Sequence, residues 1–309
     1  MILSVTLNPS VDISYTLDTF SLDAVNRVAD VSKTAGGKGL NVARVLQQLD
    51  EEVAASGFLG GSLGAFIRTE ISGLGIEDFF VNINGDTRNC IAVLHEGQQT
   101  EILEAGPVIS EDEALKFINQ FSEYVKKVDI VTISGSLPKG LEKDYYLRLV
   151  EIANRHNTPV LLDTKGELLK HTIAGENKPF LMKPNQDELA DLLGEKIDDE
   201  AQIIDALSSQ RFASVPWVVV TTGASGAIVK RNQETYRVTT PTVNAINPVG
   251  SGDAVIAGFA SGFSRGLVDV EFIKYGLAMG VLNAMEAKTG SINPEKISWC
   301  MDRIRVEKI

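Results

Sequence analysis

The order of hydrophobic and polar positions predicts a chain that alternates short strands with amphipathic helices. Runs of β-branched and apolar residues at 2–7 and 53–59 have the length and composition of buried strands. After a glycine-rich turn near residue 36, apolar residues recur at the spacing of one helix face, at Val42, Val45, Leu46 and Leu49. A second helix is predicted at 63–74. The first quarter of the chain therefore predicts strand–helix units.

From residue 110 onward the helix–strand rhythm is regular. Helices are predicted at 111–127, 143–156 and 199–211, and strands at 130–134, 160–163, 180–182 and 217–222. Segments 226–230 and 234–239 predict a hairpin, and the final part is predicted to be helical at 253–265, 269–287 and 294–305. This alternation favours an α/β fold with a central, mostly parallel sheet and helices on both faces.

Four short β-rich segments do not fit this rhythm. They lie at 11–17, 26–34, 89–94 and 100–103. We predict that they form a small β-sheet lid, inserted from about 11–34 and 88–104 into a single α/β domain that spans 1–309. The alternative is that both pairs are ordinary edge hairpins.

Polar residues and glycines stand where the predicted parallel strands end. They are Asn8, Asp12, Ser134, Gly135, Ser136, Asp163, Lys183, Asn185, Thr222 and Gly223. In open parallel sheets, ligands bind beyond the carboxyl ends of the strands. The sequence therefore predicts a binding site at this edge of the sheet.

The segment Asn247-Pro248-Val249-Gly250-Ser251-Gly252-Asp253 predicts a glycine-rich turn that opens a helix. Gly250 and Gly252 permit a sharp turn and a close approach to a ligand, and free amides at a helix start favour an anion. Asp253 has two interpretations: a helix cap, or a base that takes a proton from a hydroxyl while the amides hold a transferring anion.

A second glycine-rich turn, Gly36-Gly37-Lys38-Gly39, precedes the helix that contains Asn41. Lys38 and Asn41 are candidates for binding oxygens of a polyol or phosphate; the alternative is an ordinary helix start with a solvated lysine. Arg27 and Arg88 lie in the predicted lid, where bidentate cations suit a sugar phosphate. The alternative for both is an arginine on the surface with no ligand.

Asn185 and Glu188 are separated by one helical turn, so they could hold Mg²⁺ through water, or form a capping box. The segment 221–226, TTGASG, is a candidate nucleotide-contacting loop or a tight turn. The chain has no G-x-x-x-x-G-K-[ST] and no G-x-G-x-x-G motif. A P-loop nucleotidase and a standard dinucleotide site are therefore not supported.

Composition narrows the class of protein. Among 309 residues the net charge is -12, which argues against non-specific binding to nucleic acid or to an anionic membrane. Cys90 and Cys300 match no metal spacing and indicate a reducing compartment, and no basic leader or membrane-length apolar run is visible. We expect a cytoplasmic protein.

Two segments together carry a resemblance. AGGKGLNVARVL and NPVGSGDAVIAGFASG resemble the two signatures of the ribokinase/PfkB family of sugar kinases in kind, order and separation, and NQDE at 185–188 is similar to that family's N-x-x-E. The resemblance covers essentially the whole chain. It implies a ribokinase-like fold and transfer of the γ-phosphoryl group of ATP to a hydroxyl of a sugar phosphate. Asn247-Pro248 departs from the Asp-Thr of many members, in a region where some relatives hold a monovalent cation.

The resemblance also implies roles for individual residues. Asp253 would be the base, with Gly250, Ser251 and Gly252 forming the anion hole. The sugar would be held by Asp12, Gly36, Gly37, Lys38 and Asn41, and its phosphate by Arg88, Arg27 and Ser136. ATP and Mg²⁺ would be served by Asp163, Lys183, Asn185, Glu188, Thr222, Gly223, Gly226, Gly280 and Asn283.

Other functions and the assembly state stay open from sequence. A sugar-phosphate sensor on the same fold would be expected to lack the base or the anion-hole glycines, which this chain has. A nucleoside kinase is disfavoured because arginines in the lid suit a phosphorylated acceptor. Exposed strand edges in the lid predict a homodimer joined through it.

Overall fold

Two β-sheets of different size organise the chain in the computed structural model, which describes all 309 residues. The larger sheet has 11 strands. Their order is β15 (Arg305–Lys308), β14 (Glu234–Thr239), β13 (Ala227–Arg231), β12 (Trp217–Thr221), β11 (Leu181–Met182), β10 (Val160–Asp163), β9 (Ile130–Ser134), β1 (Ile2–Thr6), β4 (Val53–Leu59) and β5 (Glu77–Asp78), with β6 (Val81–Asn82) also paired to β4. Strands from β12 to β5 pair in parallel, and β13 to β15 are antiparallel.

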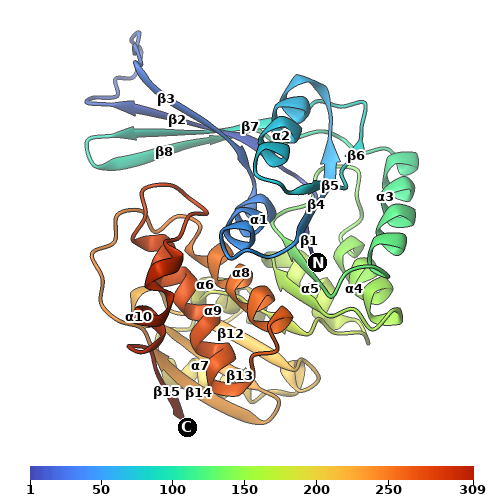
Figure 1. Cartoon of the computed structure of the whole chain (residues 1–309), viewed down its shortest axis with the longest axis vertical. Helices are drawn as coiled ribbons and strands as arrows, with labels where there is room; N and C mark the ends of the chain where they lie inside the picture. Colours follow the sequence, from blue (N-terminus) through green and yellow to red (C-terminus); the bar gives the residue numbers. More distant parts are fainter.

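Helices cover both faces of this sheet (Figure 1). One core is formed with α1 (Lys38–Gln48), α2 (Gly61–Gly73), α8 (Ser251–Ser264), α9 (Asp269–Ala284) and α10 (Ile297–Met301). The other is formed with α3 (Glu111–Tyr124), α4 (Tyr145–Arg155), α5 (Gly166–Ala174), α6 (Gln186–Leu193) and α7 (Glu200–Leu207). Leu161 joins the first core while Val160 and Leu162 join the second, as expected for a strand buried on both faces. None of the helices has both the length and the apolar content to cross a membrane.

The small sheet consists of β3 (Asp30–Gly36), β2 (Ser10–Leu17), β7 (Arg88–His95) and β8 (Gln98–Leu103), in that order. It projects from the main body in Figure 1, at the side where α1 begins. Ser10 pairs with both Gly36 and Arg88, so these three residues lie at the same end of the small sheet. Because β3 leads directly into α1, this end adjoins the start of that helix.

The predicted fold class, a mostly parallel sheet between helices with a small separate sheet, is confirmed. The prediction of a helix over 294–305 is wrong only at its end. A 3₁₀ turn, η3 (Pro294–Lys296), and α10 cover 294–301, and β15 then begins at Arg305 and pairs antiparallel with β14. The sequence of β15, RVEK, belongs to a mostly exposed edge strand, so it lacks the apolar alternation that marks buried strands. Helix α5 and strands β5 and β6 were also not predicted.

Candidate active site

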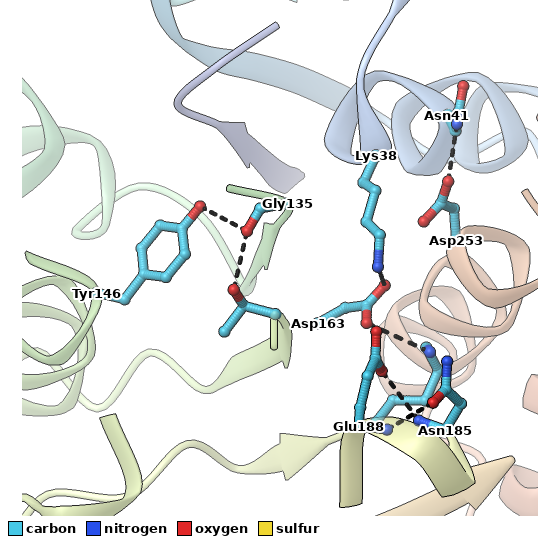
Figure 2. A network of polar contacts seen from close by, with 10 residues as sticks. Lys38, Asn41, Gly135, Tyr146, Asp163, Asn185, Glu188 and Asp253 are labelled. Carbon is cyan, nitrogen blue, oxygen red and sulfur yellow. Dashed lines mark hydrogen bonds and ion pairs between the residues drawn. The ribbon is translucent and has the colours of Figure 1, made fainter. Parts of the chain in front are cut away.

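Three strand ends and two helix starts meet at one edge of the larger sheet. Asp163 is the last residue of β10, Gly135 follows β9, and Lys183 follows β11. Helices α1 and α8 begin at Lys38 and Ser251 and bring their first turns to the same place, as Figure 2 shows. The site therefore lies where parallel sheets bind ligands.

Asp163 stands between two lysine ammonium groups, one of which is that of Lys38 (Figure 2). Its Oδ2 lies 3.2 Å from Lys38 Nζ, and its Oδ1 lies 3.3 Å from Lys183 Nζ. Burial alone would raise the pKa of this fully buried carboxyl, but Lys183 and Lys38 outweigh burial and lower it. The pKa of Lys38 is raised, because the carboxylates of Asp163, Asp253 and Glu188 outweigh its burial. Lys38 therefore stays charged.

Asp253 is buried in the first turn of α8, with 5% of its surface exposed. Its Oδ2 accepts a hydrogen bond of 2.7 Å from Asn41 Nδ2 on α1. The carboxylate forms no hydrogen bond with the amides of α8, so the alternative of a plain helix cap does not fit the structure. Burial and the nearby charge of Asp163 raise the pKa of Asp253 to about 6, which is the range of a general base near neutral pH.

The turn before α8 has the geometry of an anion-binding site. Gly250 has φ 82°, and a Cβ there would lie 2.6 Å from Thr289 Cγ2, so both backbone and space require glycine. The amides of Gly250, Gly252 and Asp253 have no hydrogen-bond partner within the chain, whereas that of Ser251, also predicted to form the anion hole, donates to Pro248 O at 3.2 Å. A Cβ on Gly252 would lie 3.1 Å from Lys183 Nζ, which places a cation beside these free amides.

Asn283, predicted to line a nucleotide, is instead packed against the glycine turn that precedes α8. It is fully buried, its Nδ2 donates to Val249 O at 2.9 Å, and its Oδ1 accepts from the amides of Gly290 and Ser291. Its hydrogen-bonding groups are thus used to brace the glycine turn. Gly280 is buried where α9 crosses α8, since a Cβ there would lie 2.6 Å from Val255 Cγ2. The predicted nucleotide contacts of both residues do not fit these positions.

Asp12 lies at the end of the small sheet that adjoins α1. Its Oδ1 accepts a 2.6 Å hydrogen bond from Ser10 Oγ. A Cβ at Gly36 would lie 2.0 Å from Asp12 Cγ, so only glycine leaves room for this carboxyl. Burial raises the pKa of Asp12, while the Ser10 hydrogen bond and the charge of Arg44 oppose the rise.

Arg88 and Ser136 are joined through Asn8. Arg88 Nη2 donates to Asn8 O at 3.1 Å, and Asn8 Nδ2 donates to Ser136 Oγ at 3.4 Å. The Nε of Arg88 and the Oδ1 of Asn8 are buried without a hydrogen-bond partner. These unsatisfied groups suit a polar ligand. Arg27 is not part of this group: it lies in the exposed loop between β2 and β3, beyond the end where Asp30 pairs with Thr16.

Asn185 and Glu188 form the capping box of α6. Glu188 N donates to Asn185 Oδ1 at 2.8 Å, and Asn185 N donates to Glu188 Oε2 at 3.0 Å. One Glu188 oxygen is left over, and no group of three or more His, Cys, Asp or Glu could hold a metal directly. Such a donor set fits Mg²⁺ only through water or through phosphate oxygens.

The segment after β12 forms a tight turn that includes the 3₁₀ helix η2 (Gly223–Ser225). Thr222 N donates to Gly226 O at 2.9 Å. Gly223 has φ 63°, and Gly226 has φ 117° with Val238 O only 2.0 Å from the position of a Cβ. The turn predicted here is confirmed, and its contact with a nucleotide stays a prediction.

Sequence reasoning missed two groups that organise the site. Arg44 donates hydrogen bonds to Asn41 Oδ1 and Ala35 O, and the i to i+3 spacing of Asn41 and Arg44 on α1 was the available signal. Tyr146 OH and Thr164 Oγ1 both donate to Gly135 O, at 3.3 and 2.9 Å. No local pattern connects those two residues to Gly135.

Comparison with known proteins agrees with this geometry. The model of the pfkB family carbohydrate kinases matches residues 5–296. A tagatose-6-phosphate kinase of Staphylococcus epidermidis is 48% identical over 310 residues, covering 100% of both chains.

Two solved structures share the fold. A Thermotoga maritima protein described as a possible 1-phosphofructokinase is 26% identical with a TM-score of 0.88, over 100% of this chain and 99% of that one. The tetrameric inhibited form of Escherichia coli phosphofructokinase-2 is 24% identical with a TM-score of 0.87, over 97% of this chain and 98% of that one.

Proposed function

Because the chain belongs to the pfkB family of carbohydrate kinases, we propose that it transfers the γ-phosphoryl group of ATP to the 1-hydroxyl of D-tagatose 6-phosphate, giving D-tagatose 1,6-bisphosphate. The observation that carries the choice of substrate is the 48% identity to a tagatose-6-phosphate kinase over the whole of both chains. The segments LNPSVDISY, DTRNCIAVLHEGQQTEILE and SGSLPKGL also resemble that enzyme. The chain is an ATP-dependent sugar-phosphate kinase.

The site supports a mechanism of positioning and charge stabilisation, which is what phosphoryl transfer requires of a protein. Asp253 takes the proton of the 1-hydroxyl. The hydroxyl oxygen bonds to the γ-phosphorus of ATP, and the bond between the γ-phosphorus and ADP breaks. The free amides of Gly250, Gly252 and Asp253 hold the transferring group. Lys183, whose ammonium lies beside Gly252, attracts the phosphates of ATP.

The sugar phosphate would bind between α1 and the small sheet. Asp12, Lys38 and Asn41 with the Gly36-Gly37 backbone face the hydroxyls, and Arg88 with Ser136 takes the 6-phosphate. Glu188 and Asn185 would hold Mg²⁺ through water, where the ion neutralises charge on the ATP phosphates. The small sheet would act as a lid that excludes water during transfer.

The acceptor is tested by comparing kcat/KM for D-tagatose 6-phosphate, fructose 6-phosphate and fructose 1-phosphate. We expect the tagatose ester to be preferred, because the chain is 48% identical to a tagatose-6-phosphate kinase over its whole length. A higher kcat/KM for fructose 1-phosphate would instead assign 1-phosphofructokinase activity. This is the second candidate function, and the Thermotoga maritima relative is described as a possible 1-phosphofructokinase. No ADP formation with any hexose phosphate would favour a sugar-phosphate sensor.

We also propose that two chains join through the small sheet. Strand β8 is exposed along its whole length, and Ile102 and Leu103 are 55% and 61% exposed. An apolar edge of this kind is apt to pair with another subunit. Sedimentation at micromolar concentration is expected to show a dimer that Ile102→Asp weakens, whereas Val108→Asp, an exposed valine outside the four strands, leaves it intact. A monomer, or a tetramer unaffected by Ile102→Asp, would contradict the proposal.

A further inference from the structure

The side-chain amide of Asn41 is held from both sides. Its Nδ2 donates to Asp253 Oδ2 at 2.7 Å, and its Oδ1 accepts a hydrogen bond from Arg44 Nη2. A primary amide can present either its NH₂ or its oxygen in a given direction. With Oδ1 directed to a guanidinium, only the NH₂ can face the carboxylate.

Arg44 is itself held by two main-chain segments. It donates to Ala35 O at the end of β3, and its Nη2 lies 3.4 Å from Thr289 O, just after the α9 helix. A Cβ on Gly290 would lie 3.2 Å from Arg44 Nε and Nη2, so the glycine leaves room for the guanidinium. The planar guanidinium thus reaches three acceptors at once, an arrangement that a lysine cannot reproduce.

We propose that Arg44 is a positioning residue of the phosphoryl transfer: by fixing the orientation of the Asn41 amide, it keeps one oxygen of Asp253 hydrogen-bonded and the other directed at the sugar hydroxyl. The proposal rests on the proposed function for its kinetic consequence. Arg44 is argued to act through Asn41 and makes no contact of its own with Asp253.

Loss of Arg44 leaves Asn41 Oδ1 without its partner, so the amide is held only through its contact with Asp253. The side chains of Asn41 and Asp253 can then shift together, because the amide is no longer anchored through Arg44 to Ala35 and Thr289. The base would then turn or lose its partner, and a displacement of about 1 Å at a reacting centre costs about 10²-fold in rate. We therefore expect Arg44→Met to lower kcat about 10- to 100-fold with little change in KM for ATP.

A double-mutant cycle separates positioning from a general structural role. In an Asn41→Ala background, Arg44→Met is expected to cost less than about 2-fold in kcat, because the amide through which it acts is gone. An equal fall in kcat on introducing Arg44→Met into the wild type and into Asn41→Ala would overturn the proposal. Arg44→Lys keeps the charge but not the three-point contact, so wild-type turnover in this variant would likewise contradict positioning.

The matched control is Arg265→Met. Arg265 also joins segments distant in sequence, through Leu49 O and Glu51, but lies at the end of α8 away from the site. Its loss is expected to lower the unfolding temperature and to leave kcat within about 2-fold of the wild type. If Arg265→Met lowers kcat as much as Arg44→Met, the effect reports stability and not positioning.

A titration of the Asp253 carboxyl carbon by NMR tests the same contact without turnover. Burial and the charge of Asp163 raise the pKa of Asp253, and the hydrogen bond from Asn41 opposes the rise. The charge of Arg44 also acts on Asp253 directly, so its removal alone moves the midpoint to higher pH. Arg44→Met is therefore expected to move the midpoint further in the wild-type background than in the Asn41→Ala background, whereas equal shifts in the two backgrounds would overturn the proposal. This readout distinguishes failure of the proposal from absence of kinase activity.

Discussion

Replacing Asp253 with asparagine is expected to lower kcat by about 10²- to 10⁴-fold, the range for loss of a positioned general base. The substitution conserves shape but removes the only carboxylate in the first turn of α8. Affinity for ATP should be retained, because the free amides of the turn and the Lys183 ammonium are unchanged. Steady-state kinetics together with nucleotide binding by calorimetry measure both quantities.

Folding of this variant can be judged separately. The pKa of Asp253 is raised in the folded chain, so its ionisation costs stability as the pH rises from 3.8 towards 6. The variant should therefore be at least as stable as the wild type at pH 7. Glu113→Gln is the matched control, since Glu113 holds the same position in α3 but bonds to the amide of Ser110 as a true cap. Near-wild-type turnover of Asp253→Asn would exclude Asp253 as the base.

The same pKa sets the pH dependence of the wild type. A base must be deprotonated to act, and burial together with Asp163 raises the pKa of Asp253 to about 6. We expect kcat/KM to fall as the pH drops below about 6, and this limb to be absent in the residual activity of Asp253→Asn.

Asp163→Asn is expected to destabilise the fold by about 3–5 kcal/mol at pH 7, because it leaves buried ammonium charge without its anion. The side chain of Lys183 is only 4% exposed, and Asp163 is fully buried between it and Lys38. Urea unfolding measures the change. Asp198→Asn is the control: its ion pair with Lys196 is solvent-exposed, so its loss should cost no more than about 1 kcal/mol.

The destabilisation should itself depend on pH. The pKa of Asp163 is lowered in the folded chain. Its contribution to the free energy of unfolding is therefore present above the ordinary pKa of 3.8 and is lost as the pH falls through the pKa of the folded chain. Wild type and variant should therefore converge in acid. Asp163 also raises the pKa of Asp253, so the acid limb of kcat/KM should move to lower pH in the variant. Equal stability of the two proteins at pH 7 would contradict the buried ion-pair network.

Local pattern accounted for much of the fold. The strand predicted at 53–59 is β4, with the same bounds, because a mostly apolar run of this length marks a strand buried on both faces. Local pattern failed where tertiary contacts determine the secondary structure. Strand β15 is held by pairing with β14, although its own sequence is mostly charged and exposed. The residues at strand ends could be assigned to one site from sequence, because a parallel sheet brings the carboxyl ends of its strands to the same edge.

The site was less predictable from sequence than the fold. Asp163, Lys183, Asn41 and Asp253 were all singled out, yet nothing local predicted which of them pair. Asn283 and Gly280 carried no sign that α9 would use them to brace the glycine turn and to approach α8. The contacts of Arg44 with Ala35 and Thr289 likewise could not be predicted, because β3 and the segment after α9 lie next to α1 only in the folded chain.

The central claim is tested most directly by identifying the product. Incubation with D-tagatose 6-phosphate, ATP and Mg²⁺, followed by ³¹P and ¹³C NMR, locates the new phosphate. The account predicts D-tagatose 1,6-bisphosphate with one ADP formed for each phosphorylated sugar, and loss of both when Asp253 is replaced with asparagine. ADP released without a bisphosphate, or a phosphate on a hydroxyl other than that of C1, would contradict it.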